Sequence, residues 1–124
     1  MDFAEAIKVH SDYRMKLRCY VTKPDHSLIP AEMAVDNRCA LGEWLYGEGR
    51  KYSGLPEYER LMSDHATFHK AAADVIERAD RGICVDSEIA VGSHSSFALA
   101  SSLIVATLTA MKVKVRAGAA EVGI

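Results

Sequence analysis

Apolar residues recur every three or four positions in four segments of this chain, the spacing that an amphipathic α-helix produces. In the first segment the apolar face includes Phe3, Ile7, Leu17 and Val21. The pattern predicts four helices, over residues 2–22, 31–46, 55–81 and 86–116. Because helices joined by short loops bury one apolar stripe each by packing side by side, we predict an all-α fold, an antiparallel four-helix bundle.

Proline, glycine and short polar residues mark the ends of these helices. Pro30 stands where the second helix can begin, and Gly47–Gly49 ends it. Gly82 is a C-terminal stop for the third helix. Asp86 or Ser87 is expected to cap the fourth helix.

The fourth predicted helix is apolar on two faces. One face consists of Phe97, Ile104, Leu108, Met111 and Val115, and the other of Leu99, Leu103, Ala106, Ala110 and Val113. A helix that is apolar nearly all round lies either in the centre of its own core or against a second subunit. In a bundle this small we expect the second arrangement, a homodimer.

The segment 89–111 also has the length of a membrane span. It contains one histidine and a cluster of serines, namely His94, Ser93, Ser95, Ser96, Ser101 and Ser102. Its strictly apolar residues recur at helical spacing instead of forming a continuous run. We therefore predict a packing helix and no membrane partner.

Length and composition narrow the class of protein. The chain of 124 residues fits one domain, residues 1–116, followed by a flexible C-terminal tail at 117–124. Fifteen Lys and Arg against seventeen Asp and Glu give a net charge of −2, which disfavours a nucleic-acid partner. Three cysteines and an acidic start without the pattern of an export signal favour a cytoplasmic location.

His65 and His69 lie four positions apart in the third predicted helix. This spacing places both imidazoles on one face, one turn apart, close enough to bind one metal ion. Such pairs also occur without a metal. This one lacks the glutamate that follows the first histidine in metallopeptidases and serves them as general base, so zinc peptidase chemistry is not expected.

Cys39 lies in the second predicted helix, where a buried cysteine is most often a small apolar residue. Gly42, three positions later, costs a helix about 1 kcal/mol relative to alanine, so some group should need the space. A metal ion with imidazoles approaching this face would need it. Trp44 is read as a core residue, and His10 in the first helix is by itself compatible with a solvated or a hydrogen-bonded histidine.

The spacing of these residues along the chain predicts that they lie close together in the folded bundle. His10, Cys39 and His65 each lie about one helix and one loop from the next. In an up-and-down bundle, residues at similar depth on successive helices meet at one level of the core. We therefore expect three nitrogens and one sulfur, from His10, Cys39, His65 and His69, to face a common point.

This set resembles the hallmark of the chemoreceptor zinc-binding (CZB) domain family. The hallmark is a histidine followed three positions later by an aromatic or apolar residue, then Cys-x-(apolar)-Gly-x-(aromatic or apolar), then His-x-x-x-His. His10 with Tyr13, the segment 39–44, and His65 with His69 match its three parts. The resemblance implies a four-helix bundle, usually dimeric, that binds one zinc ion through the three histidines and the cysteine.

The resemblance also implies a function. Domains of this family serve bacterial cytoplasmic chemoreceptors and diguanylate cyclases as sensory units, with zinc or oxidation of the zinc-bound cysteine as the proposed signal. This chain has neither a methyl-accepting coil nor a cyclase domain and resembles a free-standing member. Its output would then pass through a partner, such as a chemotaxis or cyclic-di-GMP signalling protein.

The number of ligands decides between chemical roles. Zinc takes four ligands tetrahedrally, and a catalytic zinc keeps one position for water or substrate. A closed site with four protein ligands therefore predicts that the protein is not an enzyme. Two alternatives remain: a metal-stabilised helical adaptor with a structural zinc, and a hydrolase with an open His2Cys zinc and His10 elsewhere. A di-iron centre is disfavoured because neither His65 nor His69 has a glutamate three positions before it.

The second nitrogen of each histidine should be held by a carboxylate or a backbone carbonyl. Carboxylates close enough in sequence are Asp12, Glu32, Asp36, Glu43 and Asp64. The remaining cysteines and histidines are read as non-ligands: Cys19, Cys84, His26 and His94. Of these, His94 would be the first to reconsider if a ligand were missing.

Overall fold

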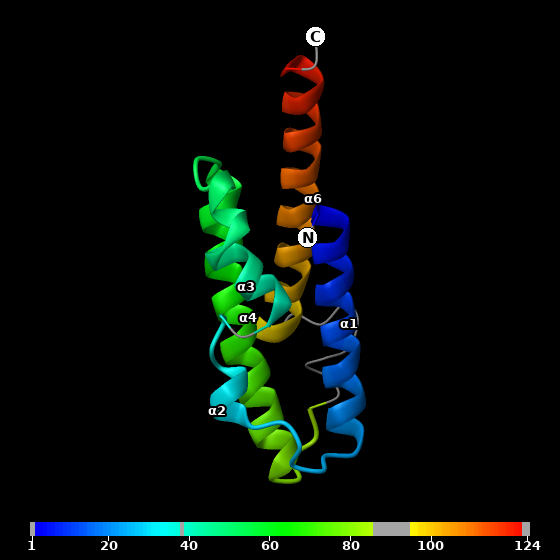
Figure 1. Ribbon diagram of the computed structural model, residues 1–124. Helices are drawn as coiled ribbons and strands as arrows, with labels where there is room; N and C mark the ends of the chain where they lie inside the picture. The colour runs from blue at the N-terminus through cyan, green and yellow to red at the C-terminus, as the bar shows by residue number, and fades with distance from the viewer. Residues whose placement is uncertain (1, 38, 86–94, 123–124) are drawn as a thin grey trace.

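The computed structural model describes residues 2–37, 39–85 and 95–122, with side chains as far as Arg116. Three long helices form its frame: α1 (Phe3–Thr22), α4 (Pro56–Asp80) and α6 (Ser96–Val122) (Figure 1). Two short helices, α2 (Pro30–Met33) and α3 (Ala40–Tyr46), and the 3-10 helix η1 (Glu48–Tyr52) connect α1 to α4. The described part of the chain is all-helical, as predicted, and has no strand.

The ends of α1 and α4 follow the predicted signals. Asp2 caps α1: its side chain accepts the N–H of Glu5 at 2.7 Å, and the Glu5 side chain accepts the N–H of Asp2 in return. Pro56 stands in the first turn of α4. Gly82 follows that helix with φ +80°, a conformation that favours glycine. The cap predicted at Asp86 or Ser87 lies outside the described residues.

The second predicted helix is the main correction. The sequence predicts one helix over 31–46, whereas the structure has two short helices, α2 and α3, separated by residues 34–39. Asp36 and Asn37, which favour turns, interrupt the run. Cys39 therefore does not lie inside a helix but directly before α3, as its N-cap.

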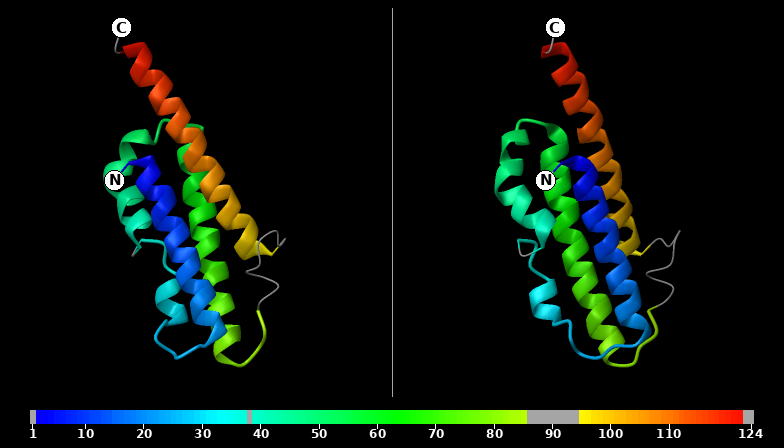
Figure 2. Two further views of the ribbon diagram at one scale, coloured as in Figure 1. Left: turned by 90° about the vertical axis from the view of Figure 1, so that its right-hand side faces the viewer. Right: turned by 45° about the vertical axis from the view of Figure 1, so that its right-hand side comes forward.

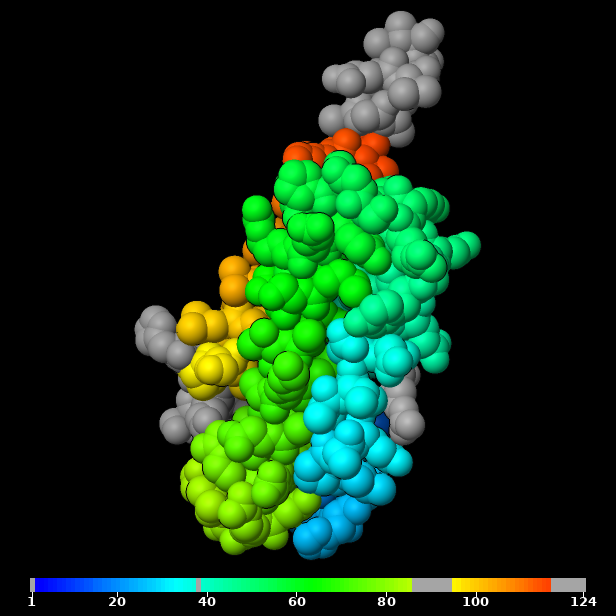
Figure 3. Space-filling model, turned by 90° about the vertical axis from the view of Figure 1, so that its left-hand side faces the viewer, coloured from blue at the N-terminus to red at the C-terminus, as the bar shows by residue number. Residues whose placement is uncertain are grey.

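The long helix α4 lies between two different neighbours. On one side it packs against α6 and on the other against the segment that contains α2 and α3 (Figure 3). α1 packs beside both α6 and α4 (Figure 2). The largest fully buried side chains come from all three long helices and α3: Leu17, Leu41, Leu45, Leu61, Phe68, Ile76, Phe97, Ile104, Leu108 and Met111.

The two apolar faces of α6 have different surroundings. Phe97, Ile104, Leu108 and Met111 of the first face are buried in the core, and Val115 is partly buried. Leu99, Leu103 and Val113 of the second face are 48%, 47% and 62% exposed. The helix continues to Val122, past its predicted end near Arg116.

By length and composition alone, the stretch Ser96–Arg116 of α6 would be able to cross a membrane. A core helix of a protein that never enters a membrane passes the same test, and this stretch packs against α4 and α1. The match in length is therefore weak evidence for a span.

Candidate metal centre

Three of the predicted ligands come together between α4 and the start of α3. Sγ of Cys39 lies 3.2 Å from Nε2 of His65 and 3.3 Å from Nε2 of His69. The two Nε2 atoms are 3.0 Å apart. One turn of α4 separates the histidines, so the helix itself sets their spacing, and the N-cap position of Cys39 brings the sulfur to them. We call these three residues the triad.

The hydrogen bonds of His69 fix which of its nitrogens faces the triad. Nδ1 lies 2.9 Å from the backbone carbonyl oxygen of Met33, which can only accept, so Nδ1 carries the proton. Burial lowers the pKa of His69 below its usual value, so the ring is neutral at pH 7. A neutral ring with its proton on Nδ1 has a lone pair on Nε2, the atom a metal would bind.

His65 is also held in its neutral form. Burial, followed by the neighbouring His69, lowers the pKa of His65 to about 3, and the side chain is only 1% exposed. Its Nδ1 has no hydrogen-bond partner within the described ranges of the chain. The ring therefore makes its polar contacts through Nε2, on the side of the triad.

Cys39 completes the group with a sulfur that accepts a backbone hydrogen bond. The N–H of Gly42 donates to Sγ at 3.3 Å, which favours the thiolate. Burial outweighs this contact and raises the pKa of the Cys39 thiol. The metal-free thiol is therefore protonated at neutral pH, and metal binding has to release that proton.

Gly42 has a different role from the predicted one. A Cβ atom at this position would lie 1.8 Å from the carbonyl oxygen of Asp36, far inside contact distance. The space is therefore needed by the backbone that leads from α2 to α3, and not by imidazoles around a metal. The glycine still serves the centre, because this close approach positions Cys39 and the donating N–H.

Tyr13, the aromatic residue of the predicted pattern, connects α1 to the same region. Its hydroxyl contacts the sulfur of Met33, and its ring centroid lies 5.7 Å from that of His69. Burial raises the pKa of Tyr13 to about 12, so it stays a neutral donor. Tyr13 thus covers the side of His69 that faces α1.

His10 lies near the triad but is not part of it. Nε2 of His10 is 2.9 Å from Oγ of Ser101 on α6, and its ring packs edge-on against Phe68 with centroids 4.7 Å apart. His10 and the triad nevertheless line one cavity of about 180 Å³. Burial, and then the positive charge of Arg14, lower the pKa of His10 to about 4, so this ring too is neutral. Its role as the fourth ligand stays a prediction.

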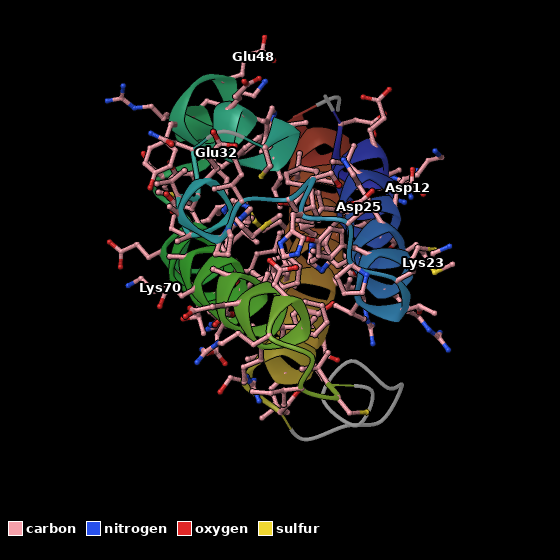
Figure 4. The ribbon with its side chains drawn as sticks, turned by 90° about the horizontal axis from the view of Figure 1, so that it is seen from below. Asp12, Lys23, Asp25, Glu32, Glu48 and Lys70 are labelled. Carbon is pink, nitrogen blue, oxygen red and sulfur yellow. The ribbon has the colours of Figure 1, made fainter. Side chains whose placement is uncertain are left out.

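Two of the five predicted carboxylate partners of the histidines, Asp36 and Asp12, have contacts with other side chains. Asp36 accepts a hydrogen bond from the hydroxyl of Tyr46 at 2.9 Å. Asp12 pairs with Lys8 at 3.0 Å and lies on the outer side of α1 (Figure 4). The partner of His69 is instead a backbone carbonyl, which the sequence pattern left open but did not assign.

The residues predicted as non-ligands lie apart from the triad where the structure describes them. Cys19 and Cys84 are exposed free thiols. His26 is in the loop after α1, with Nδ1 3.9 Å from a carboxylate oxygen of Asp80. His94 lies outside the described residues.

The donors of the triad fit zinc. One sulfur and two neutral imidazole nitrogens, all within 4.8 Å of one another, are the ligand types that zinc prefers. A family model described as the chemoreceptor zinc-binding domain (CZB) matches residues 10–76, more than half of the chain. No curated protein and no solved structure matches the chain. The triad lies inside the matched range, positioned to bind the zinc ion that gives this family model its description.

Proposed function

This chain belongs to the chemoreceptor zinc-binding (CZB) domain family, and from that membership we propose that it is a cytoplasmic zinc-binding sensory domain whose bound cysteine responds to oxidants. The observation that carries the proposal is the meeting of Cys39, His65 and His69 in one place. In the full proposal His10 supplies the fourth ligand, and the closed His3Cys site has no catalytic role.

The response of the site rests on the chemistry of the thiolate. A metal-bound cysteine is deprotonated, and the thiolate is the form that oxidants attack. With hydrogen peroxide, the sulfur of Cys39 attacks one oxygen, the O–O bond breaks, hydroxide leaves and the cysteine becomes a sulfenic acid. The oxidised sulfur is a poorer ligand, so zinc is released and the start of α3 separates from α4.

The test uses a variant in which Cys39 is the only cysteine, Cys19→Ala with Cys84→Ala, both exposed positions. We expect the purified protein to contain one zinc ion per chain and to release it when peroxide oxidises Cys39. A chromogenic chelator follows the release, and mass spectrometry follows the oxidation. Oxidised Cys39 with zinc still bound would contradict the redox response. Loss of zinc binding in His65→Ala, with Cys19→Ala as a control, tests the site itself.

We propose a second copy of the chain as the partner of α6. Leu99, Leu103, Ala106, Ala110 and Val113 follow one another at spacings of four and three, the repeat of a seam between two helices. In an antiparallel pair, the leucines of one copy would face the smaller residues of the other. We expect Leu103→Glu to shift a dimer to a monomer in sedimentation analysis, while Met15→Glu on α1 leaves the mass unchanged. A wild-type monomer at high concentration would refute this part.

The output of the domain would pass through a signalling partner. Family membership supports a chemotaxis or cyclic-di-GMP signalling protein as this partner, and a cytoplasmic location. We expect the zinc-loaded protein and the zinc-free protein to bind such a partner with different affinities, measurable by calorimetry. Equal affinities would favour the adaptor, in which zinc is purely structural. Slow zinc exchange under a competing chelator would also favour the adaptor.

One observation favours a second candidate, an open His2Cys site in a hydrolase. His10 contacts Ser101 and not the triad, which leaves three ligands. Against this candidate, His65 and His69 are buried, and the adjoining cavity of about 180 Å³ has a mostly apolar lining. Zinc-dependent hydrolysis of small esters that persists in His10→Ala would support the hydrolase. Loss of zinc affinity in that variant would support the closed site.

A further inference from the structure

Ser101 is a polar residue in an apolar place. It lies on the buried face of α6, between Phe97 and Ile104 along the core, and is 1% exposed. A hydroxyl buried without a partner is unfavourable by roughly 1–3 kcal/mol, so a serine here needs a hydrogen bond. The structure supplies one from the opposite end of the sequence, Nε2 of His10 at 2.9 Å.

The pair joins α6 to the metal centre. His10 is 4% exposed and lines the same cavity as the triad, but the hydrogen bond to Ser101 occupies one of its two ring nitrogens. A neutral imidazole has one N–H and one lone pair. If the serine oxygen accepts the proton on Nε2, the lone pair is left on Nδ1.

We propose that Ser101 is a positioning residue of the zinc centre, holding Nε2 of His10 so that Nδ1 is the nitrogen offered to the metal. This inference rests on the proposed function and deepens it, because it assigns α6 a role although that helix contributes no ligand. Metal-bound histidines commonly donate their other N–H to a fixed acceptor, which sets the tautomer and the ring orientation. His69 has the carbonyl of Met33 for this purpose, and His10 has the hydroxyl of Ser101.

The assignment distinguishes His10 from the other two histidines. His65 and His69 face the triad through Nε2, whereas His10 would bind through Nδ1. Ser101 also lies beyond residues 10–76, the range matched by the family model. The binding of the fourth ligand, His10, would thus depend on a residue outside the range that the family model matches.

The first test reads the bound nitrogens in the wild-type protein, and a substitution serves only to assign signals. Protein labelled with nitrogen-15 in its histidines is loaded with zinc, and long-range proton–nitrogen spectra identify the metal-bound nitrogen of each ring. A His10→Gln variant assigns the signals of His10. We expect metal-bound Nδ1 and protonated Nε2 for His10, with the reverse for His65 and His69. A metal-bound Nε2 in His10, or no bound nitrogen in that ring, would overturn the inference.

The second test measures zinc affinity against a competing chelator. We expect Ser101→Ala to bind zinc about tenfold more weakly, the low end of the loss typical when such a partner is removed. Ser101→Thr keeps the hydroxyl and should restore most of the affinity, and Ser102→Ala, at the exposed neighbouring position, should change nothing. Unchanged or tighter binding by Ser101→Ala would overturn the inference. The proposed function fails separately, if wild-type protein does not bind zinc or binds it equally well after His65→Ala.

Discussion

The two sides of α4 are built differently. Toward α6, side chains such as Phe68 and Ile76 lie in a continuous apolar core with Ile104 and Leu108. Toward α2 and α3, the same helix presents His65 and His69 to a cysteine and a backbone carbonyl. The long helices are thus held by buried apolar area, whereas the segment with α2 and α3 combines buried apolar side chains, Leu41 and Leu45, with a few polar atoms in fixed positions.

This difference indicates which part of the molecule should change its structure when the metal is bound or removed. Apolar packing of α1, α4 and α6 does not require zinc, so this part should keep its structure without it. α2 and α3 have four and seven residues, too few for a stable helix in isolation. Oxidation or metal loss at the triad should therefore first change the structure of the segment between Met33 and Tyr46.

The largest effect is expected from removing the metal or one of its ligands. We expect His65→Ala to weaken zinc binding by more than the 10- to 100-fold typical of an outer partner of a metal ligand. Hydrogen exchange should then speed up in residues 33–46, because the triad no longer ties this segment to α4. The exchange of buried amides in α6 should stay slow.

Chelation of zinc from the wild-type protein provides the comparison for this variant. It should reproduce the pattern of His65→Ala, with little further change when the variant itself is treated. Equal loss of protection in α6 and in residues 33–46 would show that the two sides of α4 are one cooperative unit.

The opposite side of α4 is tested by Ile104→Ala. Ile104 is fully buried, and truncation of such a side chain typically costs about 2–5 kcal/mol of unfolding free energy. We expect this loss in denaturant titrations with zinc and without it, because the cavity lies in the apolar core. Met15→Ala, at a position that is 58% exposed, should change the stability by no more than about 0.5 kcal/mol. A loss in Ile104→Ala that disappears when zinc is present would break the proposed division.

The segment between the two sides is probed by Gly42→Ala. The added Cβ would meet the carbonyl oxygen of Asp36, so the backbone has to move at a cost of about 1–3 kcal/mol. Because the N–H of this residue holds Sγ of Cys39, zinc affinity should fall as well. Both quantities are measured on the same samples, by denaturant titration and by competition with a chelator.

Gly54→Ala is the matched control, since a Cβ there meets no atom within 4 Å. It should leave zinc affinity unchanged. If Gly42→Ala binds zinc as tightly as the wild type, the close approach to Asp36 matters for the fold alone.

The same contrast explains how much the sequence predicted. The long helices α1 and α4 were predicted nearly to the residue, because apolar spacing and capping residues are local signals. The sequence pattern did not predict the break between α2 and α3, because helical apolar spacing outweighed the turn preference of Asp36 and Asn37, and periodicity does not encode the approach of the Asp36 backbone to Gly42. Helical apolar spacing continued through a segment that folds as a turn.

For the metal centre, residue types and spacing identified the three members of the triad. They did not identify the partners that set the proton positions, because one is the carbonyl of Met33 and the other is Ser101, on a distant helix. A backbone carbonyl leaves no trace in the side-chain pattern. Ser101, in contrast, is visible in the sequence as a hydroxyl on the helix face of Phe97, Ile104 and Leu108. A polar residue on a buried apolar face is the signal that could have identified it.

The smallest effect is expected at the start of α1. Asp2 accepts the N–H of Glu5 at the N-terminus of this helix, and replacing such a cap with alanine costs about 1 kcal/mol. We expect Asp2→Ala to lower the unfolding free energy by this amount and Asp2→Ser to recover most of it. Zinc affinity should not change in either variant, because the packing of α1 against α6 and α4 keeps His10 in place even when the first turn frays. A parallel loss of zinc affinity in Asp2→Ala would mean that the order of α1 is coupled to the metal centre through His10, and the boundary between the two regions would then run through α1.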